Sequence, residues 1–583
     1  MILRIFWVLA FFSFFSSAWA TSWMSTDTQN LDRLWQRVLQ AEESKLPKTA
    51  LKVLEEILER TKNEDELRGH YLKALCWRAL NQAHIQGKKP LDKLNILRQQ
   101  IDGLPKNQLA MARAIVAIWY WHYYQQNTWK FNKRSQTSGL ENEDISTWDS
   151  PKLFRKVAAL FNEAVKDKKH LQGLKTEDYV PVIQKGSLDW TYCESLYEFV
   201  LRQKISFHKF GISSLAKPSD AFEVDTRSPA FGNLDKFLEF RPETTDKQSQ
   251  LFQLIESYQQ LLSYLKNQNK KDVLVATEVE RLQAMNQHGL GSDKIDILMK
   301  RYEELAEIYA ETTESTLALH QLAMLYREKD ELVEAMKICN RAIAAYGVSD
   351  GAQLCRNLQN QIMQSGYDVQ IEHSINSSNS ELFVNYRNVK KLYFRIFKEN
   401  WSKILDRKYS NLSDHLNDKQ IRQILRKEPV AEWSQSLEPT ADYKPRDQII
   451  KLPKLERGFY RVLVSGLPQF NSRQNNKVVQ APFWVSDNVL LIRSRGTTIE
   501  GLLVDARDGN PVSEAQIKVY KKGNEGRYEE YTNLKTNQSG QFSHSKKGHR
   551  GYGSFTYYVK SLKTGEILWN QNMSFSHIGK RRS

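Results

Sequence analysis

The spacing of apolar residues changes once along this chain of 583 residues, and that change limits the folds open to it. Over residues 31–363 apolar side chains recur mainly at the three- and four-residue intervals of an α-helix. Around residues 364–366 the interval becomes two, which is typical of β-strands with one buried face. We therefore expect a multidomain protein in which an α-helical part precedes an antiparallel β part.

Short polar breaks divide the first part into segments that we expect to pair as helical hairpins. The clearest hairpin spans residues 317–346, where we compared the sequence with the 34-residue tetratricopeptide pattern of small residues between packed helices. Its positions are filled by Leu319, Leu322, Ala323, Tyr326, Ala335, Cys339 and Ala342, and Gly347 ends the unit. A weaker match to the same pattern lies at Ala50, Leu54 and Ile57. The sequence thus predicts an α-helical, tetratricopeptide-like repeat domain over residues 21–365.

The pattern of the second part predicts two antiparallel β-sandwiches, one over residues 366–487 and one over residues 488–575. The sequence leaves open whether the second sandwich is complete. Apolar residues alternate over residues 382–386 and again over 392–396, which indicates two neighbouring strands. We expect residues 414–433 to be a helical or irregular excursion. Turn signals lie at Asp508–Pro511 and Gln538–Gly540, and we expect the basic tail 576–583 to be disordered.

The amino-terminal segment has the pattern of a secretory signal peptide. Arg4 supplies a positive charge, residues 5–15 are almost all apolar, and Ala18-Trp19-Ala20 fits the small-x-small cleavage pattern. The apolar run is shorter than the roughly 20 residues needed to cross a bilayer, so we favour cleavage over a retained anchor. We therefore expect an exported protein of the periplasm or cell envelope, with residues 1–20 removed near Ala20.

The basic charge is concentrated in the β part. Residues 381–583 carry 36 Lys and Arg against 20 Asp and Glu, which accounts for the whole net charge of +16. In an exported chain this charge favours acidic proteins or anionic envelope surfaces as partners over nucleic acid. A basic surface with no role beyond solubility is the alternative.

Four cysteines in an oxidising compartment allow disulfides. Cys339 lies eight residues before Gly347 and Cys355 eight residues after it, so two antiparallel helices joined there would bring the thiols to one height. A Cys339–Cys355 disulfide and two buried free thiols remain equal alternatives. The sequence leaves the states of Cys76 and Cys193 undecided.

The motifs of catalysis and of metal or cofactor binding are missing from the sequence. The 12 histidines and four cysteines lack the spacing of zinc sites, and neither a phosphate-binding glycine loop nor a dinucleotide fingerprint is present. Ser206 and Lys209 satisfy Ser-x-x-Lys, but so short a pattern arises often by chance, and its companion motifs are absent. We predict no catalytic residue, no metal and no cofactor, and hence no enzyme.

Several segments resemble bacterial alpha-2-macroglobulin-like proteins that begin with a helical-repeat extension. Residues 384–395 resemble the first macroglobulin strands, residues 452–453 with 458–465 resemble the later strands, and residues 483–486 also fit. Residues 504–515 resemble the next domain, and the opening at residues 46–51, with Cys339 and Cys355, resembles the extension. The resemblance implies macroglobulin-like β-sandwiches and a protease as partner, because such proteins are thought to trap proteases. Many members carry a Cys-Glu-Gln thioester, whereas this chain has Cys193-Glu194-Ser195 in its helical half.

We therefore expect a non-enzymatic, exported, truncated protein of this family that provides the binding and scaffolding part of an endopeptidase-inhibitor system. The alternative is a helical-repeat adaptor of the cell envelope that binds a protein partner without any protease-related role. Both hypotheses predict a protein partner, no nucleic acid and no membrane span. The sequence leaves the oligomeric state undecided.

Overall fold

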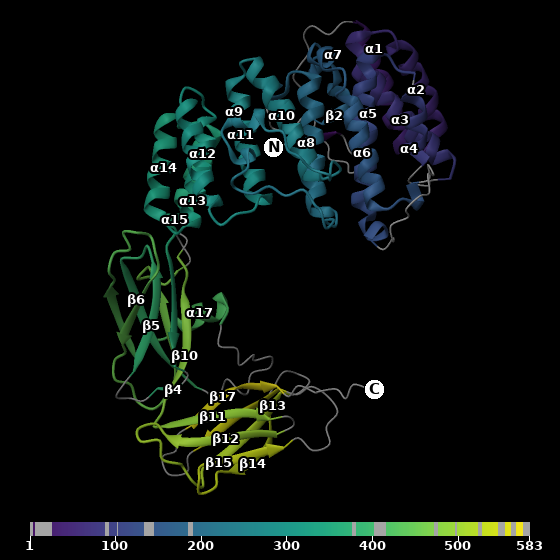
Figure 1. The fold of residues 1–583 in the computed structure, drawn as a ribbon. Helices are drawn as coiled ribbons and strands as arrows, with labels where there is room; N and C mark the ends of the chain where they lie inside the picture. Colours follow the sequence, from purple (N-terminus) through teal and green to yellow (C-terminus); the bar gives the residue numbers. More distant parts are fainter. Residues whose placement is uncertain are drawn as a thin grey trace. The chain divides into compact units, whose positions relative to one another are not determined.

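The computed structural model describes residues 4–5, 26–87, 92–101, 103–132, 145–184, 190–372, 374–375, 380–400, 416–471, 476–495, 498–522, 528–545, 554–560 and 567–574. Two compact units are present, one of residues 1–330 with 334–356 and one of residues 331–333 with 357–583. The first is helical and the second is rich in β-strands (Figure 1). A helical half followed by a β-sheet region is thus confirmed.

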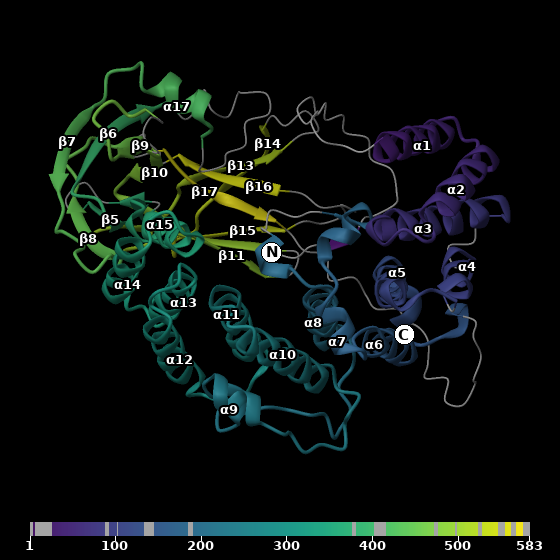
Figure 2. The ribbon, with the colours of Figure 1, turned by 90° about the horizontal axis from the view of Figure 1, so that it is seen from above.

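The helices of the first part follow one another in chain order (Figure 2). They are α1 (Thr26–Glu43), α2 (Pro47–Thr61), α3 (Arg68–Ile85), α4 (Asp92–Ile101), α5 (Lys106–Asn132), α6 (Ser150–Ala164), α7 (Lys168–Gln172), α8 (Leu196–Ser214), α9 (Leu234–Glu239), α10 (Gln250–Asn267), α11 (Lys271–His288), α12 (Lys294–Ile308), α13 (Ser315–Glu328), α14 (Leu332–Ala345) and α15 (Asp350–Met363). Short 3-10 turns lie at Asp65–Leu67, Ile145–Thr147, Thr176–Val182, Trp190–Cys193 and Pro229–Phe231. Within the described ranges, no helix is both long and apolar enough for a bilayer crossing.

Local sequence signals set where these helices begin. Pro47 opens α2, where a missing backbone N–H costs nothing, and Ala50, Leu54 and Ile57 then form its fully buried face. Ser195 and Glu198 form a capping box at the start of α8: the Glu198 carboxylate accepts from the Ser195 N–H at 2.9 Å, and the Ser195 hydroxyl accepts from the Glu198 N–H.

Helices α13 and α14 correspond to the hairpin expected over residues 317–346. Its small positions, Ala323, Ala335 and Ala342, are fully buried. Gly351 at the start of α15 lies so close to Thr316 of α13 that an added Cβ would stand 2.3 Å from its backbone. These contacts explain why small residues recur here, while the finer assignment to a tetratricopeptide-like repeat stays a prediction.

The strands begin at the expected change of period. Helix α15 ends at Met363 and β3 starts at Gly366. One antiparallel sheet has the order β3-β5-β8, and a second has the order β4-β10-β9-β6-β7 with β4 parallel to β10. Their bounds are β3 (Gly366–Ile371), β4 (Ser374–Ile375), β5 (Glu381–Arg387), β6 (Lys391–Glu399), β7 (Ala431–Ser436), β8 (Arg446–Lys451), β9 (Gly458–Ser465) and β10 (Val479–Val485). The short helix α17 (Asp418–Ile424) lies in the expected excursion.

The prediction that residues 382–386 and 392–396 form neighbouring strands is wrong. Strand β5 pairs with β3 and β8, whereas β6 pairs with β7 and β9 in the other sheet. Val384 and Phe394 nevertheless belong to one hydrophobic core shared by the two sheets. The prediction of a strand from alternating buried and exposed side chains is correct for each segment, because each strand has one buried face. That pattern does not reveal which sheet the strand joins.

Asn388 lies at the corner between β5 and β6, with a positive φ of 56°. Its amide donates to the carbonyl oxygens of Ile362 at 2.7 Å and Gln364 at 3.2 Å, at the end of α15. Its backbone N–H donates to the Thr440 hydroxyl at 2.9 Å. These bonds clamp the helix end to the loop between β7 and β8, because helix-terminal carbonyls lack partners within the helix.

The remaining strands form two further antiparallel sheets, with orders β11-β12-β15 and β14-β13-β16-β17. Their bounds are β11 (Asn488–Arg495), β12 (Thr498–Asp505), β13 (Gln516–Lys522), β14 (Tyr528–Lys535), β15 (Gln541–Ser545), β16 (Ser554–Lys560) and β17 (Ile567–Ser574). Both expected turns are present, with Gly509 and Gly540 at positive φ of 72° and 71°. The sandwich assignment and the domain bounds stay predictions.

The two chain ends lie mostly outside the described residues. Of the predicted signal peptide, only Arg4–Ile5 is described, as strand β1 paired with β2 (Ile183–Gln184). Residues 6–20, with the cleavage site at Ala20, and the tail 576–583 are outside them.

Candidate functional site

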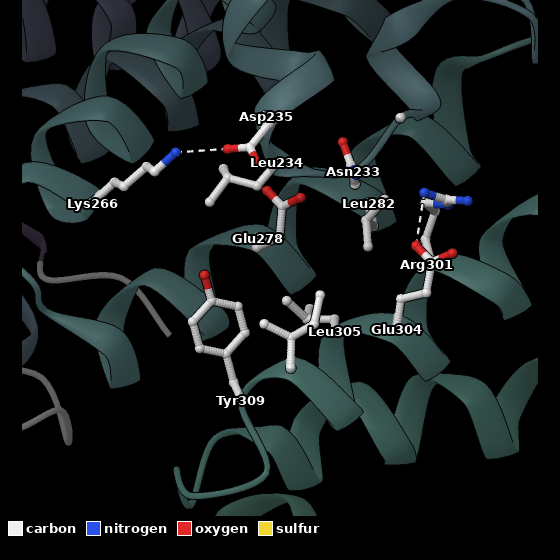
Figure 3. A pocket seen from close by; sticks show the side chains of 12 residues that line it. Asn233, Leu234, Asp235, Lys266, Glu278, Leu282, Arg301, Glu304, Leu305 and Tyr309 are labelled. Carbon is white, nitrogen blue, oxygen red and sulfur yellow. Dashed lines mark hydrogen bonds and ion pairs between the residues drawn. The ribbon is translucent and has the colours of Figure 1, made fainter.

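A pocket of about 180 Å³ lies among α9, α10, α11 and α12 of the helical unit (Figure 3). Leu234, Leu282 and Leu305 supply apolar lining, and Tyr309 adds an aromatic ring. The other lining residues are Gly232, Asn233, Asp235, Lys266, Glu278, Arg301, Glu304 and Ile308. Its volume is suited to a single apolar side chain rather than to a large ligand.

A buried ion pair holds one wall of this pocket. Arg281 is 0% exposed and Glu278 2% exposed, and the Arg281 Nε donates to the Glu278 carboxylate at 2.9 Å. The guanidinium also donates to the carbonyl oxygens of Ala230 and Gly232, and it lies 4.3 Å from the centre of the Phe237 ring. One side chain of α11 therefore fixes the segment that leads into α9.

The charges around the pocket mouth are paired with one another. Asp235 accepts from Lys266 at 2.6 Å, and Glu304 accepts from Arg301 at 2.7 Å, one turn away on α12 (Figure 3). The hydrogen bond to Asp235 raises the pKa of Lys266, and burial raises the pKa of Tyr309. With its charges already balanced, the pocket offers a partner mainly apolar contact beside Ile308, which is 65% exposed.

The Ser-x-x-Lys pair has structural partners on both sides. The Ser206 hydroxyl donates to the Arg202 carbonyl of its own helix at 2.8 Å. Lys209 lies 3.8 Å from Glu280 and 5.4 Å from the centre of the Tyr258 ring. The Ser206 bond stays within α8, whereas Lys209 contacts α10 and α11, and the non-enzyme hypothesis stays a prediction.

Cys193, in the segment that was compared with the thioester motif, is 1% exposed. Burial raises the pKa of its thiol to about 12. The neighbouring Glu194 pairs with Lys270 at 2.9 Å, and Ser195 caps α8. Burial likewise raises the pKa of the Cys76 thiol to about 12, so both thiols stay protonated and unreactive at neutral pH.

Cys339 of α14 and Cys355 of α15 are adjacent thiols, both 0% exposed. They form a hydrogen bond with each other, which lowers the pKa of Cys339 and raises that of Cys355. The structure therefore brings the predicted pair together, and the disulfide itself stays a prediction. In the described part of the chain, no group of three or more His, Cys, Asp or Glu side chains could hold a metal ion.

The sequence interpretation missed the pocket of Figure 3 entirely. Its lining comes from four helices between Gly232 and Tyr309, so no local motif marks it. The one available signal was the spacing of Glu278 and Arg281, three residues apart on α11 and next to the apolar Val279 and Leu282.

Comparisons with known proteins give limited similarity. No protein-family model matches the sequence, and no curated protein matches it. Among solved structures, native alpha-2-macroglobulin from Escherichia coli spanning domains NIE-MG1 aligns at 11% identity and a TM-score of 0.26, over 35% of this chain and 96% of that one. A structure of the same protein spanning domains MG0-NIE-MG1 aligns at 11% identity and a TM-score of 0.27, over 35% of this chain and 64% of that one. The second match covers less than two thirds of its fragment, and both TM-scores are low.

Proposed function

We propose that this chain is a non-enzymatic protein of the alpha-2-macroglobulin family that provides the binding and scaffolding part of an endopeptidase-inhibitor system. Its helical unit is a tetratricopeptide-like repeat that binds the partner protein, and its two pairs of sheets are macroglobulin-like sandwiches. The protein is exported and works in the periplasm or cell envelope after cleavage near Ala20.

The main support comes from where the family-like segments lie. Residues 384–387 are in β5, residues 391–395 are in β6, and residues 458–465 make up β9. These strands come from two sheets that share one hydrophobic core. Segments chosen from the sequence for their resemblance to macroglobulin strands therefore act as strands around a common core, as the proposal requires.

The pocket of Figure 3 supports binding through the helical unit. Stacked helices present extended surfaces to partners, and apolar pockets with balanced charges accept anchoring side chains. Ile308 stands at this pocket and is 65% exposed, so a partner can bury it without disturbing the fold.

Mixing the whole chain with trypsin and running a denaturing gel tests the non-enzymatic part of the proposal. Without trypsin, the chain should not hydrolyse a protease substrate. Mixed with trypsin, it should form no covalent adduct, because Cys193 is buried and protonated. A stable covalent adduct would contradict this proposal.

Surface plasmon resonance against a panel of serine proteases tests binding. We expect Ile308→Asp to weaken non-covalent binding by about tenfold, because it places a charge at the apolar pocket. Val348→Asp is the matched control, since Val348 is fully exposed and lies outside the pocket lining. Absence of binding to every protease would leave the adaptor hypothesis as the better account of this pocket.

A further inference from the structure

A second and larger pocket, of about 670 Å³, lies elsewhere in the helical unit. The start of α6, the segment after α8, the start of α10 and the end of α11 surround it. Phe154, Ile212, Phe222 and Leu251 give it an apolar lining. A volume of this size accommodates several groups of a ligand, whereas the pocket of Figure 3 accommodates one side chain.

A guanidinium and an imidazole at this pocket differ from the paired charges in Figure 3. Arg155 and His288 line it, and neither has an ion-pair or hydrogen-bond partner within the ranges that the structure describes. The other charged lining residues are engaged: Lys217 lies 3.4 Å from Glu223, and Asp246 accepts from the Phe222 N–H. Within the described residues, Arg155 is therefore a lining cation without a counter-ion, while the one lining carboxylate, Asp246, is bonded to a backbone N–H.

The surroundings of His288 add to the positive charge at the pocket. Burial lowers the pKa of His288, and the positive charges of Lys209, Lys217 and Lys294 lower it further. Charges close enough to repel an imidazolium also attract a carboxylate at the same place.

Amide side chains supply groups that match a peptide backbone. Gln248, Gln250 and Gln287 line the pocket. The Gln250 Oε1 lies 2.9 Å from the buried His208 Nδ1, and Gly211 lies so close that an added Cβ would stand 2.6 Å from Oε1. The Gln250 Nε2 also donates to the Gln248 carbonyl at 3.4 Å, so the amides that face a ligand are those of Gln248 and Gln287.

We propose that this pocket binds a partner's peptide segment in which a carboxylate follows an apolar side chain. The carboxylate forms an ion pair with Arg155 and accepts a hydrogen bond from the His288 imidazole. The apolar side chain contacts Phe154 and Phe222, and the peptide groups bond to the side-chain amides of Gln248 and Gln287. The inference rests on the proposed partner binding and names the chemistry of the partner. A fatty acid shares the carboxylate and the apolar chain but has no groups to match the amides.

Fluorescence polarisation with the whole chain tests the proposal. The probe is a fluorescein-labelled hexapeptide that ends in Gly-Phe with a free carboxylate, and its comparison is the same peptide with a carboxyl-terminal amide. We expect the free acid to bind about tenfold more tightly, because only the acid forms charge-assisted hydrogen bonds. Equal affinity for the two peptides, or binding of neither, would overturn the proposal.

Variants assign the effect to this pocket. Arg155→Ala should reduce the preference for the acid to about twofold or less, whereas Arg33→Ala, at an exposed arginine of α1, should leave it unchanged. Ala216→Trp should abolish binding of the peptide, because Ala216 is an exposed lining residue and indole would fill the pocket. Unchanged circular dichroism shows that each variant folds, and unchanged peptide binding by the folded Ala216→Trp variant would refute the assignment.

Two further arms separate the alternatives. Decanoate should displace the peptide less effectively than unlabelled peptide does, and the reverse order would overturn the peptide assignment in favour of a lipid. Protease binding is measured independently through Ile308→Asp. Peptide binding without protease binding would therefore count against the protease-related function alone, and protease binding without peptide binding would count against this pocket alone.

Discussion

Arg281 is the buried cation that most clearly ties separate segments of the helical unit together. It bonds to Glu278 on its own helix and to two carbonyl oxygens of the segment before α9. A buried ion pair often adds little net stability, but removal of one partner leaves the other charge without compensation in a low-dielectric interior. The contribution of Arg281 to the free energy of unfolding should thus depend on whether Glu278 is still present.

We predict that Arg281→Met lowers the free energy of unfolding by about 3–5 kcal/mol, because the Glu278 carboxylate stays buried without its partner. The double variant Arg281→Met with Glu278→Leu should recover a large part of this loss. Urea unfolding followed by circular dichroism measures both variants. A double variant no more stable than Arg281→Met would contradict the explanation from uncompensated charge.

His208 should make the helical unit sensitive to acid. Its pKa falls from 6.5 to about 3, chiefly because it is buried and further because of the Lys204 charge. Between these pH values the unfolded chain binds a proton that the folded chain does not, so stability decreases as pH falls through this range.

We predict that the free energy of unfolding of the wild type falls by about 3 kcal/mol between about pH 7 and about pH 4. In His208→Gln this fall should be absent, because glutamine does not titrate. Glutamine can also keep a hydrogen bond to Gln250. Urea midpoints at the two pH values measure the effect, and His84→Gln, at an exposed histidine of α3, is the control. Equal acid sensitivity of the wild type and His208→Gln would exclude this role.

Helices and strands were predictable to different degrees. The hairpin of α13 and α14 was found because the small residues Ala323, Ala335 and Ala342 recur where the two helices pack closely. Strand β7 was missed because its six residues carry only Ala431 and Trp433 as apolar positions. Trp433 stacks on Phe394 of β6, a contact that only the folded sheet supplies. Both pockets were missed because each lining combines residues of several helices, which no local motif marks.

Helices α14 and α15 bring Cys339 and Cys355 into contact, and we predict a disulfide between them in exported protein. The bridge would close a loop of the fifteen residues between the two cysteines, which corresponds to about 3 kcal/mol of stabilisation in the chain-entropy model. Peptide mapping without reductant tests for the bond directly. Two free thiols in protein recovered from the periplasm would show that the prediction is wrong.

At the scale of the whole molecule, the change of apolar period coincides with the passage from α15 to β3. The compact units divide slightly earlier, between Arg356 and Asn357 inside α15. A pattern in the sequence reports secondary structure, whereas a compact unit is defined by tertiary contacts, so the two boundaries need not agree.

We predict that residues 31–363 expressed alone fold into a helical domain, because the described helices of this range bury a continuous apolar core of their own. Circular dichroism should give a helical spectrum with a cooperative thermal transition. Limited proteolysis of the whole chain should release a stable fragment of similar size. An unfolded spectrum for residues 31–363 would show that the division is misplaced.

The Asn388 clamp also determines how the end of α15 carries mechanical load. The amide holds the Ile362 and Gln364 carbonyl groups, while the Asn388 backbone is held by Thr440. Tension on the helix end is therefore shared with the loop between β7 and β8 instead of passing only along the chain into β3. Detaching the helix end requires bonds between segments far apart in the sequence to rupture together, so this corner should resist pulling more than the covalent linkage alone would.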